Sequence, residues 1–225
     1  FFLADVVGHF ALLHVVEAVV LRSRTRRCNL ARTEKIGQDS SRHDKHDGNR
    51  DACINEAFLM KEVASGANLG VDVIQIDDGW QVAVGDWLNV KKDKFPHGLE
   101  PIVEKIHENG FIAGLWLAPF GVQKDSEFFE AHQDWLLKPG GKLWPAGINW
   151  GSFYSLDIDK PEVAGYIEEV FDTVLNKWGF DFVKLDFLYA AAPYGTEYES
   201  RAGRMIRAME LLRRVCKDRL ILGCG

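Results

Sequence analysis

The feature that most constrains this chain is a unit of helix, glycine and buried strand that recurs from residue 57 onward. Each unit has apolar residues at helical spacing and then, after a turn, an almost continuous apolar run. The four apolar runs lie at residues 71–77, 111–117, 180–186 and 219–223. Continuous apolar strands that alternate with helices are typical of parallel strands buried on both faces. The chain is therefore predicted to be an α/β protein.

The helices expected between these runs have the usual end signals. Their apolar periodicity places them at residues 60–67, 99–106, 161–178 and 205–212. Pro161 opens the third helix, and Gly70, Gly110 and Gly179 end the first three. The runs after Gly70 and Gly179 share one template, which reads glycine, apolar, Asp, apolar, apolar, polar, apolar, Asp. This similarity predicts equivalent positions in a repeated βα architecture.

Two architectures fit such repeats, an open doubly wound sheet and a (β/α)8 barrel. Neither G-x-G-x-x-G nor G-x-x-x-x-G-K-[ST] follows any of the expected strands, which removes the commonest reason for the open sheet. In a barrel, the chemistry lies at the carboxyl ends of several strands. Six residues fall there, namely Asp77, Asp78, Trp116, Lys184, Asp186 and Cys224.

The first 56 residues do not share the repeat. Residues 1–21 are mostly apolar, but four polar residues between Asp5 and Glu17 would be costly in a bilayer, so a core or interface helix is expected and a membrane segment is not. Residues 22–56 are polar and lack any period, which is typical of a linker. We therefore expect an atypical apolar segment and linker over residues 1–56, followed by the repeat domain at 57–225.

The charge balance and the cysteines narrow the partners and the compartment. The chain has 27 Lys and Arg against 33 Asp and Glu, giving a net charge of −6, the wrong sign for a protein that neutralises phosphates. Nucleic acid is therefore not an expected partner. The four cysteines show no C-x-x-C spacing and no secreted framework, which favours a reducing, cytoplasmic compartment.

The most suggestive strand end carries Lys184 and Asp186. Side chains alternate along a strand, so both point the same way, together with Phe182. An ammonium beside a carboxylate favours its ionised form, as a nucleophile requires at neutral pH. A structural Lys-Asp pair that caps the strand is the alternative interpretation.

A second strand end carries Asp77-Asp78-Gly79-Trp80. Adjacent aspartates face different directions, so one can accept substrate hydroxyls while the other caps the next helix. Tryptophans follow several strand ends. Trp116 is expected to line a pocket, whereas Trp135 and Trp150 fit a pocket and the core equally well. A pocket of carboxylates and tryptophans suits uncharged, hydroxyl-rich ligands with apolar C–H faces, and sugars are such ligands.

Four linked motifs resemble glycoside hydrolase family 36, the α-galactosidases and their relatives. They are GVDVIQIDDGW at 70–80, GLWLAPF at 114–120, WGFDFVKLDFLYAA at 178–191 and LGCG at 222–225. The resemblance covers roughly residues 68–225, in the right order. It implies a retaining glycosidase on a (β/α)8 barrel that needs neither metal nor other cofactor.

The resemblance also implies a role for each matching residue. Asp186 would be the catalytic nucleophile, with Lys184 contacting the sugar. Asp77 and Asp78 would bind galactose hydroxyls around C4 and C6. The other expected contacts with the substrate are Trp80, Trp116, Cys224 and Gly225.

Departures from the family pattern predict an incomplete domain. A G-W-C-S-W type first strand is absent from residues 1–56, and the general acid is expected in a segment beyond Gly225. We therefore expect about strands two to five of eight, and no hydrolysis by the isolated chain. A homo-oligomer is a further expectation for the complete protein.

Three functions stay open at this point. The first is an α-galactosidase that cleaves terminal α-linked galactose from oligosaccharides. The second, within the same resemblance, is a raffinose-synthase-like galactosyltransferase or an α-N-acetylgalactosaminidase. The third is a non-catalytic sugar-binding remnant.

Overall fold

The structure is a computed structural model that describes residues 18–23, 30–33, 54–195 and 198–225. Its main sheet has six strands in the order β2-β1-β3-β4-β8-β9. The central strands are β3 (Val73–Ile76), β4 (Ile112–Leu117), β8 (Phe182–Leu185) and β9 (Leu220–Gly223). These four pair in parallel, each with the next. The predicted α/β class and the four predicted strands are confirmed.

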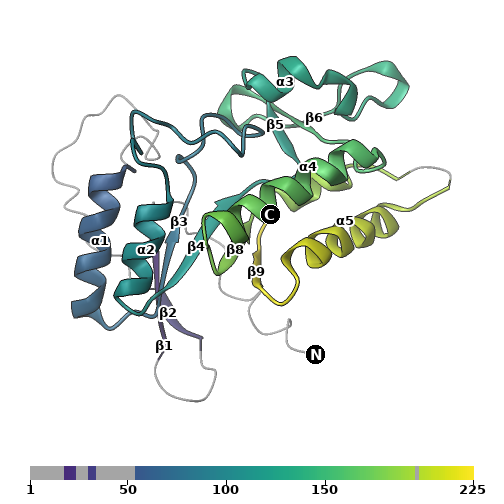
Figure 1. The fold of residues 1–225 in the computed structure, drawn as a ribbon. Coiled ribbons are helices and arrows are strands. Elements are labelled where there is room, and N and C mark those ends of the chain that lie inside the picture. The colour runs from purple at the N-terminus through teal and green to yellow at the C-terminus, as the bar shows by residue number, and fades with distance from the viewer. Residues whose placement is uncertain (1–17, 24–29, 34–53, 196–197) are drawn as a thin grey trace.

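The helices lie beside one another along one side of this sheet (Figure 1). Their bounds are α1 (Glu56–Leu69), α2 (Glu100–Glu108), α4 (Pro161–Asp172) and α5 (Arg201–Cys216). A π-helical turn, η5 (Thr173–Lys177), extends α4. The order of helices and strands confirms the predicted repeat, and α1 packs beside α2 as α4 packs beside α5.

Local signals explain where these helices begin and end. The Asn55 side chain accepts a hydrogen bond from the Phe58 amide at 2.9 Å, which caps α1. Gly70 ends α1 in the left-handed conformation, with φ 63° and ψ 44°. Ser200 caps α5 in the same way as Asn55 caps α1. Pro161, as predicted, stands in the first turn of α4.

A second, smaller sheet follows the carboxyl end of β4. It has the order β5-β7-β6, with β5 (Gly121–Gln123), β6 (Pro145–Gly147) and β7 (Phe153–Ser155). Helix α3 (Glu127–Ala131) and the short 3-10 turns η2 (Gln133–Trp135), η3 (Pro139–Gly141) and η4 (Asn149–Gly151) belong to the same region. A further turn, η6 (Leu188–Ala191), follows β8. In Figure 1 this region lies beyond one end of the main sheet.

The N-terminal part differs from the expectation where it is described. Strands β1 (Ala18–Ser23) and β2 (Leu30–Thr33) pair with each other, and β1 runs antiparallel to β3. The expected linker is therefore wrong at Leu30–Thr33, because backbone pairing to β1 builds an edge strand without an apolar period. The end of the apolar segment, Ala18–Leu21, is strand and not helix. The expected helix over residues 3–11 lies outside the described residues.

The two faces of the parallel strands have different roles. Ile74, Leu115 and Val183 are fully buried on the helix side. On the other face, the register aligns Gln75 with Gly114 and Gly114 with Phe182. A Cβ atom on Gly114 would lie 2.1 Å from the Phe182 ring. The missing side chain thus leaves room for that ring directly beneath the strand ends.

Gly114→Ala should therefore destabilise the chain by about 2 to 3 kcal/mol, because the added methyl overpacks the Phe182 ring. Urea unfolding followed by tryptophan fluorescence measures this change. The matched control is Gly165→Ala on the exposed side of α4, where nothing lies within 4 Å, and it should stabilise by up to about 1 kcal/mol. Equal effects of the two substitutions would contradict this packing.

Candidate active site at the carboxyl ends of the strands

An ion pair connects two strands that are not neighbours. Lys184, on β8, donates from Nζ to Asp77 Oδ2 over 2.7 Å, and Asp77 directly follows β3. Strand β4 lies between them and places Trp116 beside Lys184. The sequence predicted Lys184 as the neighbour of Asp186, but its hydrogen-bond partner is Asp77.

Asp77 has partners on both carboxylate oxygens. Its Oδ2 also accepts a hydrogen bond from Gln75 Nε2 at 2.9 Å, and its Oδ1 accepts one from the Asp78 amide at 3.0 Å. Gln75 is fully buried, and its own Oε1 has no hydrogen-bond partner. Burial works to lower the pKa of the Lys184 ammonium, but the Asp77 charge and hydrogen bond raise it above its usual value. Lys184 is therefore a permanent cation among carboxylates.

Asp78 faces a different set of partners, as expected for adjacent residues. Its Oδ1 accepts a hydrogen bond from Gln81 Nε2 at 2.5 Å, and its Oδ2 accepts one from Trp150 Nε1 at 2.9 Å. Burial raises the pKa of the Asp78 carboxyl above its usual value, against these two hydrogen bonds, which lower it. The side chain is half-buried, so a ligand can still reach it.

Asp186 directly follows β8 and is half-buried. Its Oδ1 accepts a hydrogen bond from the Phe187 amide at 2.7 Å, and its Oδ2 accepts one from Trp116 Nε1 at 3.3 Å. Phe187 has a left-handed backbone, with φ 52°, which turns the chain sharply after the carboxylate. One donor from β4 and one from the turn after β8 thus fix the orientation of Asp186.

The end of the described chain lies against the same carboxylate. The Cys224 amide donates to the Leu185 carbonyl at 2.8 Å, and a Cβ atom on Gly225 would lie 2.8 Å from Asp186 Oδ1. Burial, and then the negative charge of Asp186, raise the pKa of the Cys224 thiol to about 12. Cys224 is therefore a neutral thiol at the edge of the site.

The structure brings most of the predicted site residues together, but not Trp80. Asp77, Lys184, Trp116, Asp186 and Cys224 form one connected group, and Asp78 joins it through Asp77. Trp80 has no exposed surface and packs edge-on against Trp178, while its indole N–H donates to the Trp116 carbonyl. The expectation that Trp80 contacts a ligand is wrong for this structure, because the ring points into the core and supports Trp116. Trp116 was expected to line a pocket, but the residue is only 2% exposed, and it contributes its N–H to Asp186 instead.

The sequence predicted no contact with the aspartates for three further residues of the site. Gln75 and Gln81 each hold one aspartate, and Trp150 reaches Asp78 from the second sheet region. The polar position in the shared strand template was the one signal for Gln75. Trp150 lies 72 residues from Asp78, so no local pattern could join them.

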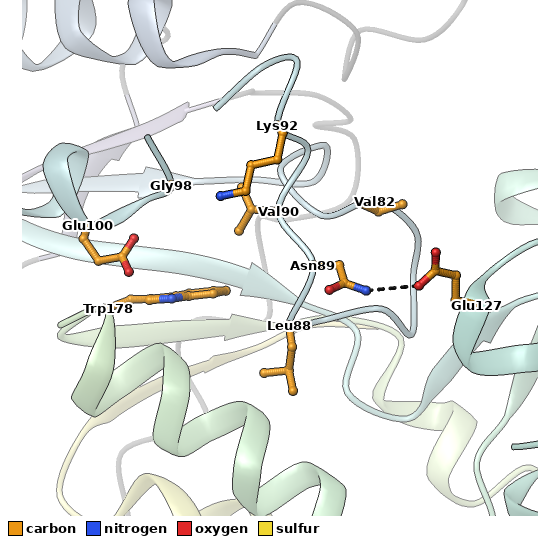
Figure 2. Close-up of a pocket in the computed structure, with 9 residues that line it drawn as sticks. All are labelled: Val82, Leu88, Asn89, Val90, Lys92, Gly98, Glu100, Glu127 and Trp178. Atoms are coloured by element: carbon orange, nitrogen blue, oxygen red, sulfur yellow. Dashed lines mark hydrogen bonds between the residues drawn. The ribbon is translucent and has the colours of Figure 1, made fainter. Parts of the chain in front are cut away.

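A hollow of about 420 Å³ lies elsewhere, between the loop after β3, the start of α2 and Trp178 (Figure 2). Asn89 donates a hydrogen bond to Glu127 there, at 3.4 Å. None of the predicted site residues lines it. We place the candidate site at the strand ends, where charged side chains from β3 and β8 meet beside Trp116 of β4.

A comparison with known families decides the relationship. The sequence profile of the Melibiase family matches residues 52–209. The chain belongs to the Melibiase family. An α-galactosidase of Escherichia coli is 31% identical over 170 residues, which cover 71% of this chain and 23% of that protein. The chain thus spans about a quarter of the length of this curated relative.

Solved structures agree with the family. The α-galactosidase TtGalA of Thermus thermophilus, solved in complex with stachyose, is 41% identical, with a TM-score of 0.69. The match covers 76% of this chain and 37% of that one. The GH36 α-galactosidase AgaA of Geobacillus stearothermophilus is 25% identical, with a TM-score of 0.61, and the match covers 76% of this chain and 26% of AgaA. The resemblance to glycoside hydrolase family 36 is confirmed.

Metal-binding clusters and membrane-spanning helices are both absent from the described residues. These residues contain no group of three or more His, Cys, Asp and Glu side chains arranged to hold a metal ion. Among them, too, no helix combines the length and apolar character that crossing a bilayer requires.

The neutral thiol provides a test of this geometry. At pH 8 a thiol with a pKa of about 12 is only roughly one part in 10⁴ thiolate, so Cys224 should react very slowly with iodoacetamide. Asp186→Asn removes the nearby negative charge and should speed alkylation of Cys224, measured by peptide mass spectrometry. Cys216, whose pKa of about 12 arises from burial, is the internal control and should keep its rate. An unchanged Cys224 rate would contradict the contact.

Proposed function

We propose that this chain forms the sugar-binding and nucleophile-bearing part of a retaining α-galactosidase. The observation that carries the proposal is the cluster of Asp77, Lys184, Trp116 and Asp186 at the ends of three parallel strands. Family membership and the α-galactosidase names of the relatives support this reaction over the other interpretations. Stachyose, bound by the T. thermophilus relative, makes galactoside oligosaccharides the proposed substrate class.

In this proposal Asp186 is the nucleophile. One Asp186 oxygen forms a bond to the anomeric carbon while the glycosidic C–O bond breaks, and a general acid protonates the leaving oxygen. Water then cleaves the covalent intermediate, so the product keeps the α configuration. The hydrogen bonds from Trp116 and the Phe187 amide support this role, because they orient the carboxylate before attack.

The surrounding groups are proposed to read the galactose hydroxyls. Asp77 and Asp78 accept hydrogen bonds from hydroxyls around C4 and C6, and Lys184 donates one. Cys224 and Gly225 lie beside Asp186, and we propose that they contact the substituent at C2 of the sugar. A pocket that satisfies its polar groups with hydroxyls rejects a sugar that leaves them unpaired, by as much as ~10⁴.

The (β/α)8 barrel and its boundaries belong to the same proposal. We propose that residues 57–225 supply about strands two to five of eight, and that a later segment supplies the general acid. The edge strand β9 supports this, because Leu220 and Leu222 are 68% and 41% exposed on the face that carries Phe182 and Lys184. A following parallel strand would pair with that edge and cover those side chains.

The role of Asp186 is best tested in a chimera, the T. thermophilus enzyme with residues 54–225 of this chain in place of the matching segment. Asp186→Asn in this chimera should lower kcat for an aryl α-galactoside by several orders of magnitude, with little change in Tm. Asp172→Asn, an exposed carboxylate on α4, is the matched control and should leave kcat unchanged. A fluorinated galactosyl donor should label the peptide containing Asp186, and labelling of another carboxylate would refute the assignment.

If a later segment supplies the general acid, the isolated chain and the chimera should differ in their hydrolysis of raffinose. The 225-residue chain should not hydrolyse raffinose, because general acid help is typically worth ~10² to 10⁴ in rate and a sugar is a poor leaving group. The chimera should hydrolyse it. Assays of released galactose decide the matter, and full raffinose activity of the isolated chain would place the acid within residues 1–225.

A further inference from the structure

One tryptophan from outside the main sheet reaches across the candidate site. Trp150 lies in the turn η4 of the second sheet region, and its Nε1 donates a hydrogen bond to Asp78 Oδ2 at 2.9 Å. Its ring packs edge-on against Trp116, with centroids 6.0 Å apart. Trp116 in turn donates to Asp186. A single side chain therefore contacts both the Asp78 carboxylate and the ring that orients Asp186.

The backbone around Trp150 is held in a costly conformation. Trp150 has φ 53° and ψ 34°, in the left-handed region that a bulky residue rarely adopts. Phe187, which directly follows Asp186, is also left-handed, and the rings of Trp150 and Phe187 lie 5.0 Å apart. Phe153 packs against both rings at 5.3 Å. The two strained aromatic residues thus pack against each other, with Trp150 at Asp78 and Phe187 at Asp186.

We propose that Trp150 is a positioning residue that fixes the direction of Asp78 and so sets the selectivity for the sugar hydroxyl that Asp78 reads. The proposal rests on the proposed function, because it takes Asp78 as a sugar-binding group. It adds a contribution from the second sheet region to a site that the motifs assign to the main sheet alone. With Gln81 on Oδ1 and Trp150 on Oδ2, the carboxylate keeps one orientation, and each oxygen keeps a lone pair that can accept a sugar hydroxyl.

The groups around Asp78 determine how its pKa changes when the hydrogen bond from Trp150 is lost. Burial and the neighbouring Asp77 raise the pKa of Asp78, while Gln81, Trp150 and Lys91 lower it. Without the indole N–H, Gln81 is the remaining side-chain hydrogen-bond donor, so the pKa of Asp78 rises. A protonated Asp78 is a poor acceptor of hydrogen bonds from hydroxyls. As the pH is lowered, the substituted protein should therefore lose substrate affinity at a higher pH than the unsubstituted protein does.

The test uses Trp150→Phe in the T. thermophilus chimera, because phenylalanine keeps the ring packing and loses the N–H. We expect KM for an aryl α-galactoside to rise about tenfold with kcat within about threefold. The acid limb of the kcat/KM profile should move to higher pH, and the preference for galactoside over glucoside should fall. Trp144→Phe, in the same region and packed on Tyr194, is the matched control and should change none of these.

A second readout needs no turnover. In the 225-residue chain labelled with 5-fluorotryptophan, the ¹⁹F resonance that Trp150→Phe removes should shift on acidification, and Asp78→Asn should abolish that shift. A resonance indifferent to both changes would overturn the contact.

The outcomes separate the two proposals. A lower Tm of Trp150→Phe with unchanged KM, acid limb and galactose preference would make Trp150 merely structural and overturn the inference. An inactive unsubstituted chimera would count against the proposed function, and the ¹⁹F titration would still decide the role of Trp150.

Discussion

The hydrogen-bonded ion pair between Lys184 and Asp77 is the interaction on which the rest of the site depends. It joins the ends of β8 and β3 across the intervening β4, over 2.7 Å. Two strand spacings of about 4.8 Å separate the backbones. The lysine side chain bridges this span because the register of the three strands brings Asp77, Trp116 and Lys184 to one level. The pair is half-buried, so losing either partner would leave a poorly solvated charge among the remaining carboxylates.

The layer beneath the ion pair makes this alignment possible. Gly114 leaves room for the Phe182 ring, and buried Gln75 supports Asp77 from below. On the outer side, buried Trp80 holds the Trp116 carbonyl, while Trp116 directs its own N–H to Asp186. The aromatic residues thus act mainly as a framework for the carboxylates. In the described structure their rings make few surfaces for a ligand, since Trp116 itself is only 2% exposed.

The sequence predicted the repeat well because parallel buried strands and glycine-terminated helices leave strong local signals. The runs at 71–77 and 180–186 contain β3 and β8. Because the carboxyl ends of parallel strands meet at one edge of a sheet, Asp77 and Asp186 could be placed there together. What the sequence missed arises from contacts distant along the chain. Trp80 carries the same motif signal as its neighbours, but its burial depends on Trp178. The contact of Trp150 with Asp78, and the antiparallel pairing of β1 with β3, likewise depend on tertiary packing that no local pattern records.

The position of a bound galactose-shaped ligand tests the proposed site most directly. A crystal structure of the T. thermophilus chimera with 1-deoxygalactonojirimycin, an iminosugar bound by a G. stearothermophilus relative, addresses this directly. We expect the ring nitrogen beside Asp186, with the hydroxyls around C4 and C6 within hydrogen-bond distance of Asp77, Asp78 and Lys184. An iminosugar seated in the hollow beside Trp178, or one that contacts Asp186 but none of those three side chains, would contradict the proposed site.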